Sequence, residues 1–223
     1  MSETVLVVAP HPDDETLGCG GSIMKWVEEG KTVHWLIVTN MRPAYGFDQN
    51  MCAKRQVQIK EVASRLGFAS VIDLAFEPAG LSSLDERVVI SAVHDVFQSV
   101  KPSIILSPFR DDIHSDHRVV FDALLAASKS FRAPFVKRLL CYETISETDY
   151  GLDPNRAAFK PNVYFDISSY LDSKIETLEL YEGELLPFPF PRSTDAVRAL
   201  ARLRGSQCNV EAAEAFMLLK EIP

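Results

Sequence analysis

Residues Thr4 to Ala9 form an unbroken apolar run, TVLVVA, that is rich in β-branched side chains. A strand with no alternating polar residues is typical of a sheet that is covered on both faces. The following segment, from about Glu15 to Glu28, reads as a helix that ends at Gly30, and TVHWLIVT from Thr32 to Thr39 reads as a second buried strand. This β-α-β order predicts parallel strands joined by a helical crossover.

The same alternation continues along the chain. We expect further helices at about residues 52–66, 84–100 and 116–129, and further strands at 70–74, 103–108 and 136–142. The last third is less regular, with a strand in NVYFDIS, helices at 169–181 and 194–204, an ambiguous segment at 212–219 and a proline-rich surface loop at 186–192. The pattern predicts an α/β fold, with a Rossmann-like three-layer α/β/α architecture and a mostly parallel sheet.

The length and charge of the chain narrow the classes of function. The 223 residues contain no repeat or low-complexity linker, so we expect a single domain over residues 1–223. A net charge of -8 and the lack of a basic cluster argue against a nucleic acid partner. The start of the chain does not resemble a signal peptide, and no apolar run is long enough for stable membrane insertion, which together predict a cytoplasmic protein.

Two loops carry the residues that are suited to chemistry. The first, PHPDD, follows the strand Thr4 to Ala9, and the second, RDDIHSDHR, follows the strand at residues 103–108. Because the carboxyl ends of parallel strands lie at one edge of a sheet, we expect both loops to meet there. Adjacent carboxylates such as Asp13 and Asp14 repel each other, so the pair needs a cation or a shared proton.

The residue types in these loops favour a metal site. Catalytic zinc is held by three nitrogen or oxygen ligands and keeps a fourth position open, which makes His11, Asp14 and His117 the predicted ligands. Asp13 then stands beside the metal as a general base. His114 is expected to stabilise an oxyanion as an imidazolium or to protonate a leaving amine, and Asp116 to orient one of the imidazoles. The same ligands also accept iron or cobalt.

The motifs PHPDDETLGCGG and DDIHSDH resemble the two signature motifs of the PIG-L or LmbE-like family of zinc-dependent de-N-acetylases. The segments KRQVQIKEVASRLGF, PNVYFDISSYLDSKIETL, PRSTDAVRALARLRG and AEAF are similar to later parts of bacterial members. The resemblance implies the same zinc ligands, the same base and the same role for His114 as the residues alone suggest. It also implies hydrolysis of an acetamido group on a small-molecule N-acetylated sugar or glycoconjugate, giving acetate and a free amine.

Some residues depart from the family pattern and bear on the substrate. Arg55 matches a family arginine that contacts the sugar, and we expect Arg42 and Arg192 to bind substrate as well, in particular a phosphate. The family's T-D-G-E after the second strand is replaced here by a sequence with Asn40, Met41 and Arg42. Asp112 stands where thiol-sugar deacetylases can carry a tyrosine. These departures argue against an inositol or malate glycoside.

Two other functions remain open at this point. One is a zinc amidase that cleaves a larger acyl or thiol-sugar conjugate, which product analysis distinguishes because it releases no acetate. The other is a non-catalytic, nucleotide-binding Rossmann-like module, but such a module calls for G-x-G-x-x-G after the first strand, where this chain has carboxylates. The phenylalanines at 188 and 190 are compatible with a homo-oligomer contact.

Overall fold

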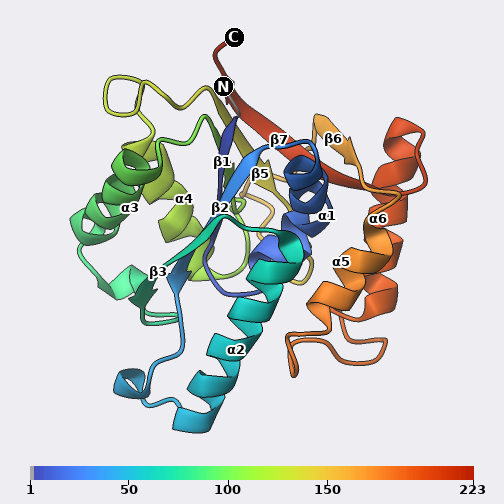
Figure 1. The fold of residues 1–223 in the computed structure, drawn as a ribbon, viewed down its shortest axis with the longest axis horizontal. Coiled ribbons are helices and arrows are strands. Elements are labelled where there is room, and N and C mark those ends of the chain that lie inside the picture. The colour runs from blue at the N-terminus through green and yellow to red at the C-terminus, as the bar shows by residue number, and fades with distance from the viewer. Residues whose placement is uncertain (1–2) are drawn as a thin grey trace.

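A computed structural model describes residues 3–223 and confirms the predicted α/β fold class (Figure 1). Within these residues one seven-stranded sheet has the order β3-β2-β1-β4-β5-β7-β6. The strands are β1 (Thr4–Ala9), β2 (Thr32–Thr39), β3 (Ser70–Phe76), β4 (Ile104–Ser107), β5 (Arg138–Tyr142), β6 (Val163–Asp166) and β7 (Ala213–Glu221). The first five pair in parallel, whereas β7 runs antiparallel to both β5 and β6. The sheet is therefore mostly parallel, as the alternation of elements predicted.

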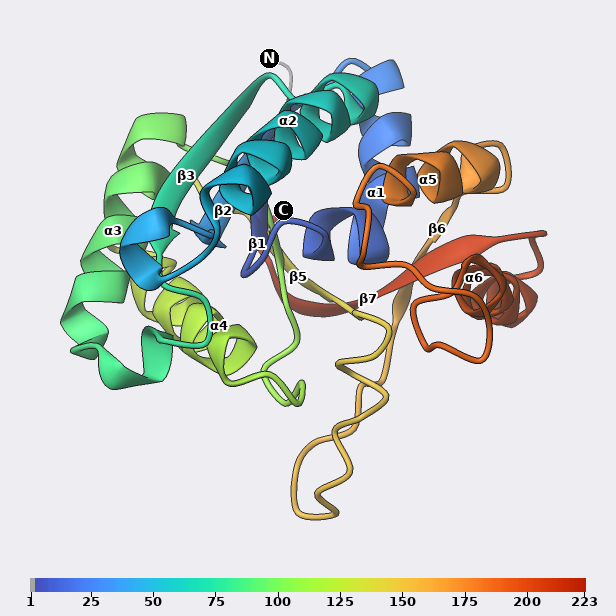
Figure 2. The same ribbon diagram turned by 90° about the horizontal axis from the view of Figure 1, so that it is seen from below.

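Helices cover both faces of this sheet (Figure 2). The α-helices are α1 (Asp14–Glu28), α2 (Gln49–Leu66), α3 (Glu86–Val100), α4 (Ser115–Ala127), α5 (Leu171–Leu178) and α6 (Thr194–Cys208), and short 3-10 turns lie at Pro43–Tyr45 and Leu81–Ser83. Helices α3 and α4 pack together on one side, while α1, α2 and α5 lie on the other. None of the helices within residues 3–223 is long and apolar enough to cross a membrane.

The central strand β1 shows why the chain needs an unbroken apolar run. Val5 and Val7 are fully buried in the core beneath α1 and α2, whereas Leu6 and Val8 are fully buried in the core beneath α3 and α4. Successive side chains of a strand point to opposite faces, so a strand in the middle layer must be apolar at every position. Burial on both faces fixes β1 as the scaffold for the loop that follows it.

The glycines after β1 allow α1 to approach the sheet closely. A Cβ atom at Gly18 would lie 2.3 Å from the Tyr142 ring, and one at Gly21 would lie 2.8 Å from the side chain of Ile167. The Tyr142 hydroxyl in turn donates to the carbonyl oxygen of Val8, at 2.8 Å. The glycine-rich part of the first motif is thus a packing requirement of this helix, and it brings the helix start to the end of β1.

The strand order creates a switch point at β1 and β4. From β1 the chain proceeds outward through β2 to β3, and β4 and β5 extend the sheet in the opposite direction. Loops that leave neighbouring strands at such a point diverge and leave a crevice at the carboxyl edge. The loops after β1 and β4 are the two that carry the histidine and carboxylate motifs, so the fold brings both motifs to this crevice.

The C-terminal part differs in detail from the expectation. The ambiguous segment at 212–219 belongs to strand β7, and the helix expected at 169–181 is the shorter α5. The alanines of AEAFMLL favour a helix locally, but Ala213 and Ala215 are buried between β5 and β6, where tertiary packing decides. The loop at 186–192 contains no helix or strand, and Phe188 in it is exposed.

Candidate metal centre

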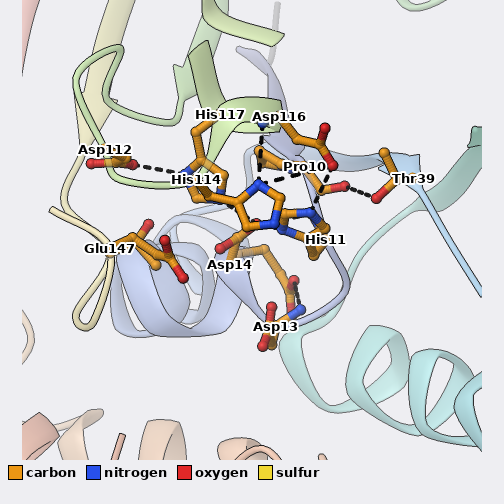
Figure 3. A network of polar contacts seen from close by, with 12 residues as sticks. Pro10, His11, Asp13, Asp14, Thr39, Asp112, His114, Asp116, His117 and Glu147 are labelled. Atoms are coloured by element: carbon orange, nitrogen blue, oxygen red, sulfur yellow. Dashed lines mark hydrogen bonds and ion pairs between the residues drawn. The ribbon is translucent and has the colours of Figure 1, made fainter. Parts of the chain in front are cut away.

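The three predicted metal ligands lie together at the switch point (Figure 3). His11 follows β1, Asp14 begins α1, and His117 lies in the first turn of α4. Asp14 Oδ2 is 3.3 Å from His11 Nδ1 and 3.3 Å from His117 Nε2. One ligand atom from each residue lies within 4.8 Å of the other two, a separation that suits a single metal ion.

The hydrogen bonds around these residues test whether a metal fits. His117 is fully buried, and its Nδ1 lies 2.7 Å from Asp112 Oδ2, which holds the proton on Nδ1, so that Nε2 carries the lone pair whenever the ring is neutral. His117 Nε2 and Asp14 Oδ1 have no hydrogen-bond partner within residues 3–223. Buried acceptors without a donor are costly unless a cation binds them. The donor set and its pairing therefore fit a metal such as zinc.

The carboxylates around the two ligand histidines favour a positive charge at this site. Burial acts to lower the pKa of His117, but Asp14 and Asp112 outweigh it and raise that pKa well above its usual value. Burial likewise opposes ionisation of Asp14, but His117 and His11 hold its pKa well below the usual value. For His11, the carboxylates of Asp116 and Asp14 overcome burial and raise the pKa to about 9. The cluster keeps a negative carboxylate and attracts cations.

Asp13 lies beside the ligands in an unusual backbone conformation, with φ 151° and ψ -28°. Glu15 Oε2 accepts a hydrogen bond from the Asp13 amide at 3.0 Å, and Arg192 Nη1 donates to Asp13 Oδ2 at 2.7 Å. Burial and the nearby Asp14 carboxylate raise the pKa of Asp13 to about 7, while Arg192 opposes the shift. A carboxylate with this pKa can accept a proton near neutral pH and release it again.

His114 is the N-cap of α4, and its Nδ1 accepts a hydrogen bond from the Asp116 amide at 3.1 Å. Burial, followed by the nearby His11 and His117, lowers the pKa of His114 to about 4. The sequence suggested an imidazolium at this position, whereas the structure favours the neutral form. With Nδ1 acting as an acceptor, the proton of that neutral ring is on Nε2.

Asp116 connects several parts of the site. Its Oδ2 lies 3.1 Å from His11 Nε2 and accepts from the Ala79 amide at 2.7 Å. Asp116 is fully buried, and its contact with His11 orients the ring of that residue. Asp112 likewise orients the ring of His117, through its 2.7 Å contact with Nδ1.

A pocket of about 270 Å³ opens over this centre. Its apolar wall is formed by Pro12, Met41, Phe47, Pro78 and Ala79. Its polar lining comprises His11, Asp13, Thr39, Asn40, Arg55, His114, Glu147, Glu184 and Arg192. A small cavity with an apolar wall and a few polar groups at one end is typical of a small-molecule site.

The three arginines that were expected to bind substrate occupy different positions. Arg55 lines the pocket but is buried, donates to the Pro12 carbonyl oxygen at 3.0 Å and pairs with Glu184. Arg192 also lines the pocket, and its contact with Asp13 places it next to the candidate base. Arg42 is not part of the pocket lining and pairs with Asp73 at 2.5 Å.

Several polar residues of the site were not singled out from the sequence. Glu147 and Glu184 line the pocket, and Glu15 holds Asp13 while Tyr181 donates to Glu15 Oε1 at 2.7 Å. Glu15 belongs to the first motif, PHPDDETLGCGG, so the motif could have pointed to it. Glu147, Tyr181 and Glu184 lie in irregular segments outside both motifs. Only the tertiary structure shows that they belong to the site.

The three clustered ligands, the adjacent carboxylate and the overlying pocket at the edge of a mostly parallel sheet define a metal-dependent hydrolase. The chain belongs to the PIG-L family, because the model of that family, GlcNAc-PI de-N-acetylase, matches residues 6–128. The matched region includes both loops of the site. This match confirms the family that the two motifs indicated.

Individual relatives agree with this assignment. The chain is 26% identical to a probable N-acetyl-alpha-D-glucosaminyl L-malate deacetylase 2 of Bacillus cereus, over 82% of this chain and 84% of the relative. It is 27% identical to the diacetylchitobiose deacetylase of Thermococcus kodakarensis, over 81% of this chain and 69% of the relative. A conserved protein of Thermus thermophilus superposes with a TM-score of 0.78 at 26% identity, covering 100% of this chain and 97% of that one.

Proposed function

We propose that this protein is a zinc-dependent de-N-acetylase, which hydrolyses the acetamido group of an N-acetylated amino sugar or sugar conjugate to acetate and a free amine. The observation that carries the proposal is the pair of buried, unpartnered acceptors, His117 Nε2 and Asp14 Oδ1, next to a carboxylate whose pKa is about 7. Family membership and relatives that are named as deacetylases of sugar derivatives support the substrate class.

His11, Asp14 and His117 would hold the zinc ion, with Asp112 and Asp116 orienting the two imidazoles. When bound, zinc supplies a Lewis acid that polarises the amide carbonyl and makes water more acidic. Two imidazoles and one carboxylate form a known catalytic zinc set that leaves room for substrate. Iron or cobalt fits the same donors, so zinc is the proposed metal rather than the only one the chemistry allows.

Asp13 acts as the general base and then as the general acid. It takes one proton from the attacking water, whose oxygen forms the new bond to the acetyl carbon. When the carbon–nitrogen bond breaks, Asp13 returns that proton to the leaving nitrogen, which gives the neutral amine and acetic acid. The acetic acid carries the second proton of the water and releases it to solvent, so that the product is acetate. A pKa of about 7 suits both transfers near neutral pH.

His114 stabilises the charge that develops on the carbonyl oxygen. Its Nδ1 is used by the Asp116 amide, so the neutral ring offers its Nε2 proton to the pocket. A preoriented donor directed at a developing oxyanion is worth about 3–4 kcal/mol of barrier in other hydrolases. His114 therefore acts as an electrostatic partner that does not need to be charged.

The test is acetate release from a panel of N-acetylated amino sugars and their glycosides by zinc-loaded protein. Asp13→Asn is expected to lose activity by a factor of about 10² or more while it keeps zinc. Asp95→Asn, at a position 76% exposed on α3, is the matched control and should leave the rate unchanged. Near wild-type activity of Asp13→Asn would refute the role of the base. A protein that binds zinc but releases acetate from no member would favour the amidase acting on larger acyl groups.

A further inference from the structure

The cations that line the pocket are already neutralised by the protein. Arg192 donates through Nη1 to Asp13 at 2.7 Å, through Nη2 to Glu147 at 2.9 Å and through Nε to Ser146 at 2.6 Å. The other arginine of the lining, Arg55, pairs through Nη2 with Glu184, which also lies 3.8 Å from Arg192. Only Arg55 Nε has no hydrogen-bond partner within residues 3–223, and a neutral hydroxyl oxygen can accept from it as well as an anion can. A phosphate or carboxylate on the substrate would therefore have to displace carboxylates that are built into the site.

The pocket also contains acceptors that lack donors. Asn40 is 1% exposed, and its amide nitrogen donates to Asp73 at 2.8 Å, which leaves Asn40 Oδ1 as a buried acceptor. Glu147 is 8% exposed, and its Oε2 is a second buried acceptor. Neither oxygen has a hydrogen-bond partner within residues 3–223. Buried acceptors call for a donor from a ligand, and an oxyanion cannot supply one.

These two acceptors lie on opposite sides of the metal centre. Asn40 directly follows β2, and Glu147 lies in the loop that follows β5. In the sheet, β2 and β5 flank the central pair β1 and β4, whose loops carry the metal ligands. A ligand whose acetamido group reaches the metal would thus meet an acceptor on each side of it, as the hydroxyl groups of a sugar ring can.

We infer that the site selects uncharged, hydroxyl-bearing N-acetylated amino sugars and discriminates against sugars that carry a phosphate or carboxylate. This inference rests on the proposed function, since it assigns the substrate class of the same pocket. It reverses the expectation that the arginines bind phosphate. Glu184 is the residue to change in a test of this charge pairing, because its carboxylate contacts both arginines of the pocket lining. It takes no part in the proposed proton transfers.

The test compares the methyl glycoside of N-acetylglucosamine with its 6-phosphate as substrates for zinc-loaded protein. We expect kcat/KM for acetate release to favour the uncharged sugar by about tenfold or more. In Glu184→Gln the ratio should move toward the phosphate by about tenfold, because two guanidinium groups lose a carboxylate partner. Glu182→Gln, at an exposed position of the same loop, should leave the ratio unchanged. Equal rates on both sugars, or a ratio that Glu184→Gln does not alter, would overturn the inference.

A second variant tests the donor requirement. Asn40→Ala removes the free acceptor and is expected to raise KM for the uncharged sugar about threefold to tenfold. Asn50→Ala, on the exposed start of α2, is its control. An unchanged KM in Asn40→Ala would show that this acceptor does not bind substrate and would overturn its part in selection.

Failure of the inference can be distinguished from failure of the proposed function. If wild-type protein releases no acetate from either sugar, its affinity for both is measured by calorimetry. Tighter binding of the uncharged sugar would then keep the inference and refute the deacetylase. Equal binding, tighter binding of the phosphate or no binding of either sugar would overturn the inference.

Discussion

Arg192 Nη1 donates a hydrogen bond to Asp13 Oδ2 at 2.7 Å, although the two residues are 179 positions apart in the chain. Arg192 precedes α6, and Asp13 immediately precedes α1, so this contact connects the C-terminal third of the protein to the candidate base. The guanidinium group opposes the rise in the pKa of Asp13 that burial and Asp14 produce. The irregular last third is therefore part of the site.

Arg192→Gln is expected to shift the pH dependence of activity. Asp13 must be ionised to act as a base, and loss of Arg192 removes a group that lowers its pKa. The acidic limb of the kcat profile should therefore move to higher pH, with a lower kcat at pH 7. Arg198→Gln, which removes an ion pair with an exposed aspartate on α5, serves as the control. An unshifted acidic limb would show that Arg192 does not influence the base.

Asp112→Asn is expected to weaken zinc binding by about tenfold to 100-fold. A carboxylate that accepts from the other ring nitrogen of a ligand histidine fixes the orientation of the imidazole and raises the basicity of the imidazole. Asp112 contacts His117 at 2.7 Å. Competition with a chromophoric chelator measures the affinity. Asp111→Asn changes the neighbouring carboxylate, which has no contact with His117, and should bind zinc normally. Equal affinities of the two variants would contradict the role of Asp112.

Removal of the metal should abolish activity and reduce stability. Removal of the metal by a chelator leaves two buried acceptors, Asp14 Oδ1 and His117 Nε2, without partners. Free zinc at about 100 times its dissociation constant should raise the free energy of unfolding by about 2.7 kcal/mol. Thermal unfolding with and without zinc measures this difference. A Tm that does not respond to zinc would argue against the proposed ligands.

Tyr181→Phe is expected to lower kcat with little change in KM or in zinc content. The Tyr181 hydroxyl donates to Glu15, and Glu15 in turn holds the amide of Asp13 in its unusual conformation. Loss of the hydroxyl should also cost about 1 kcal/mol of stability. Tyr170→Phe removes a surface hydroxyl that bonds to Glu28, and it should keep full activity. A normal kcat for Tyr181→Phe would show that Asp13 is held without this link.

Lys174→Met is expected to destabilise the fold by about 3–5 kcal/mol, because it leaves a buried carboxylate without its counter-ion. Lys174 Nζ lies 2.6 Å from Glu214 Oε1, and both side chains are almost fully buried. Glu214 also accepts from the amides of Gly21 and Ser22, just beyond the break in α1 at Cys19. Urea unfolding measures the loss, with exposed Lys54→Met as the control. A loss below 1 kcal/mol would contradict this role.

Much of the fold and the centre of the site were predictable from local sequence. The apolar run at Thr4–Ala9 specified a strand covered on both faces, and the alternation of strands with helices predicted the mostly parallel sheet, whereas the strand order came only from the structure. Segment 212–219 was not predictable, because its alanines suit a helix, while the gap between β5 and β6 makes it a strand. The proposed zinc ligands came from two motifs at the ends of parallel strands, which the fold places at one edge.

The sequence by itself determined the α/β class, the family and the set of side chains suited to hold a metal, because these depend on periodicity and short motifs. Only the tertiary structure decided what surrounds that centre. The contacts of Arg192 with Asp13, and of Arg55 with Glu184, join residues more than 100 positions apart. Charge pairing of this kind depends on distances that no local pattern encodes, and it places carboxylates against Arg55 and Arg192, two of the arginines that the sequence suggested for phosphate binding.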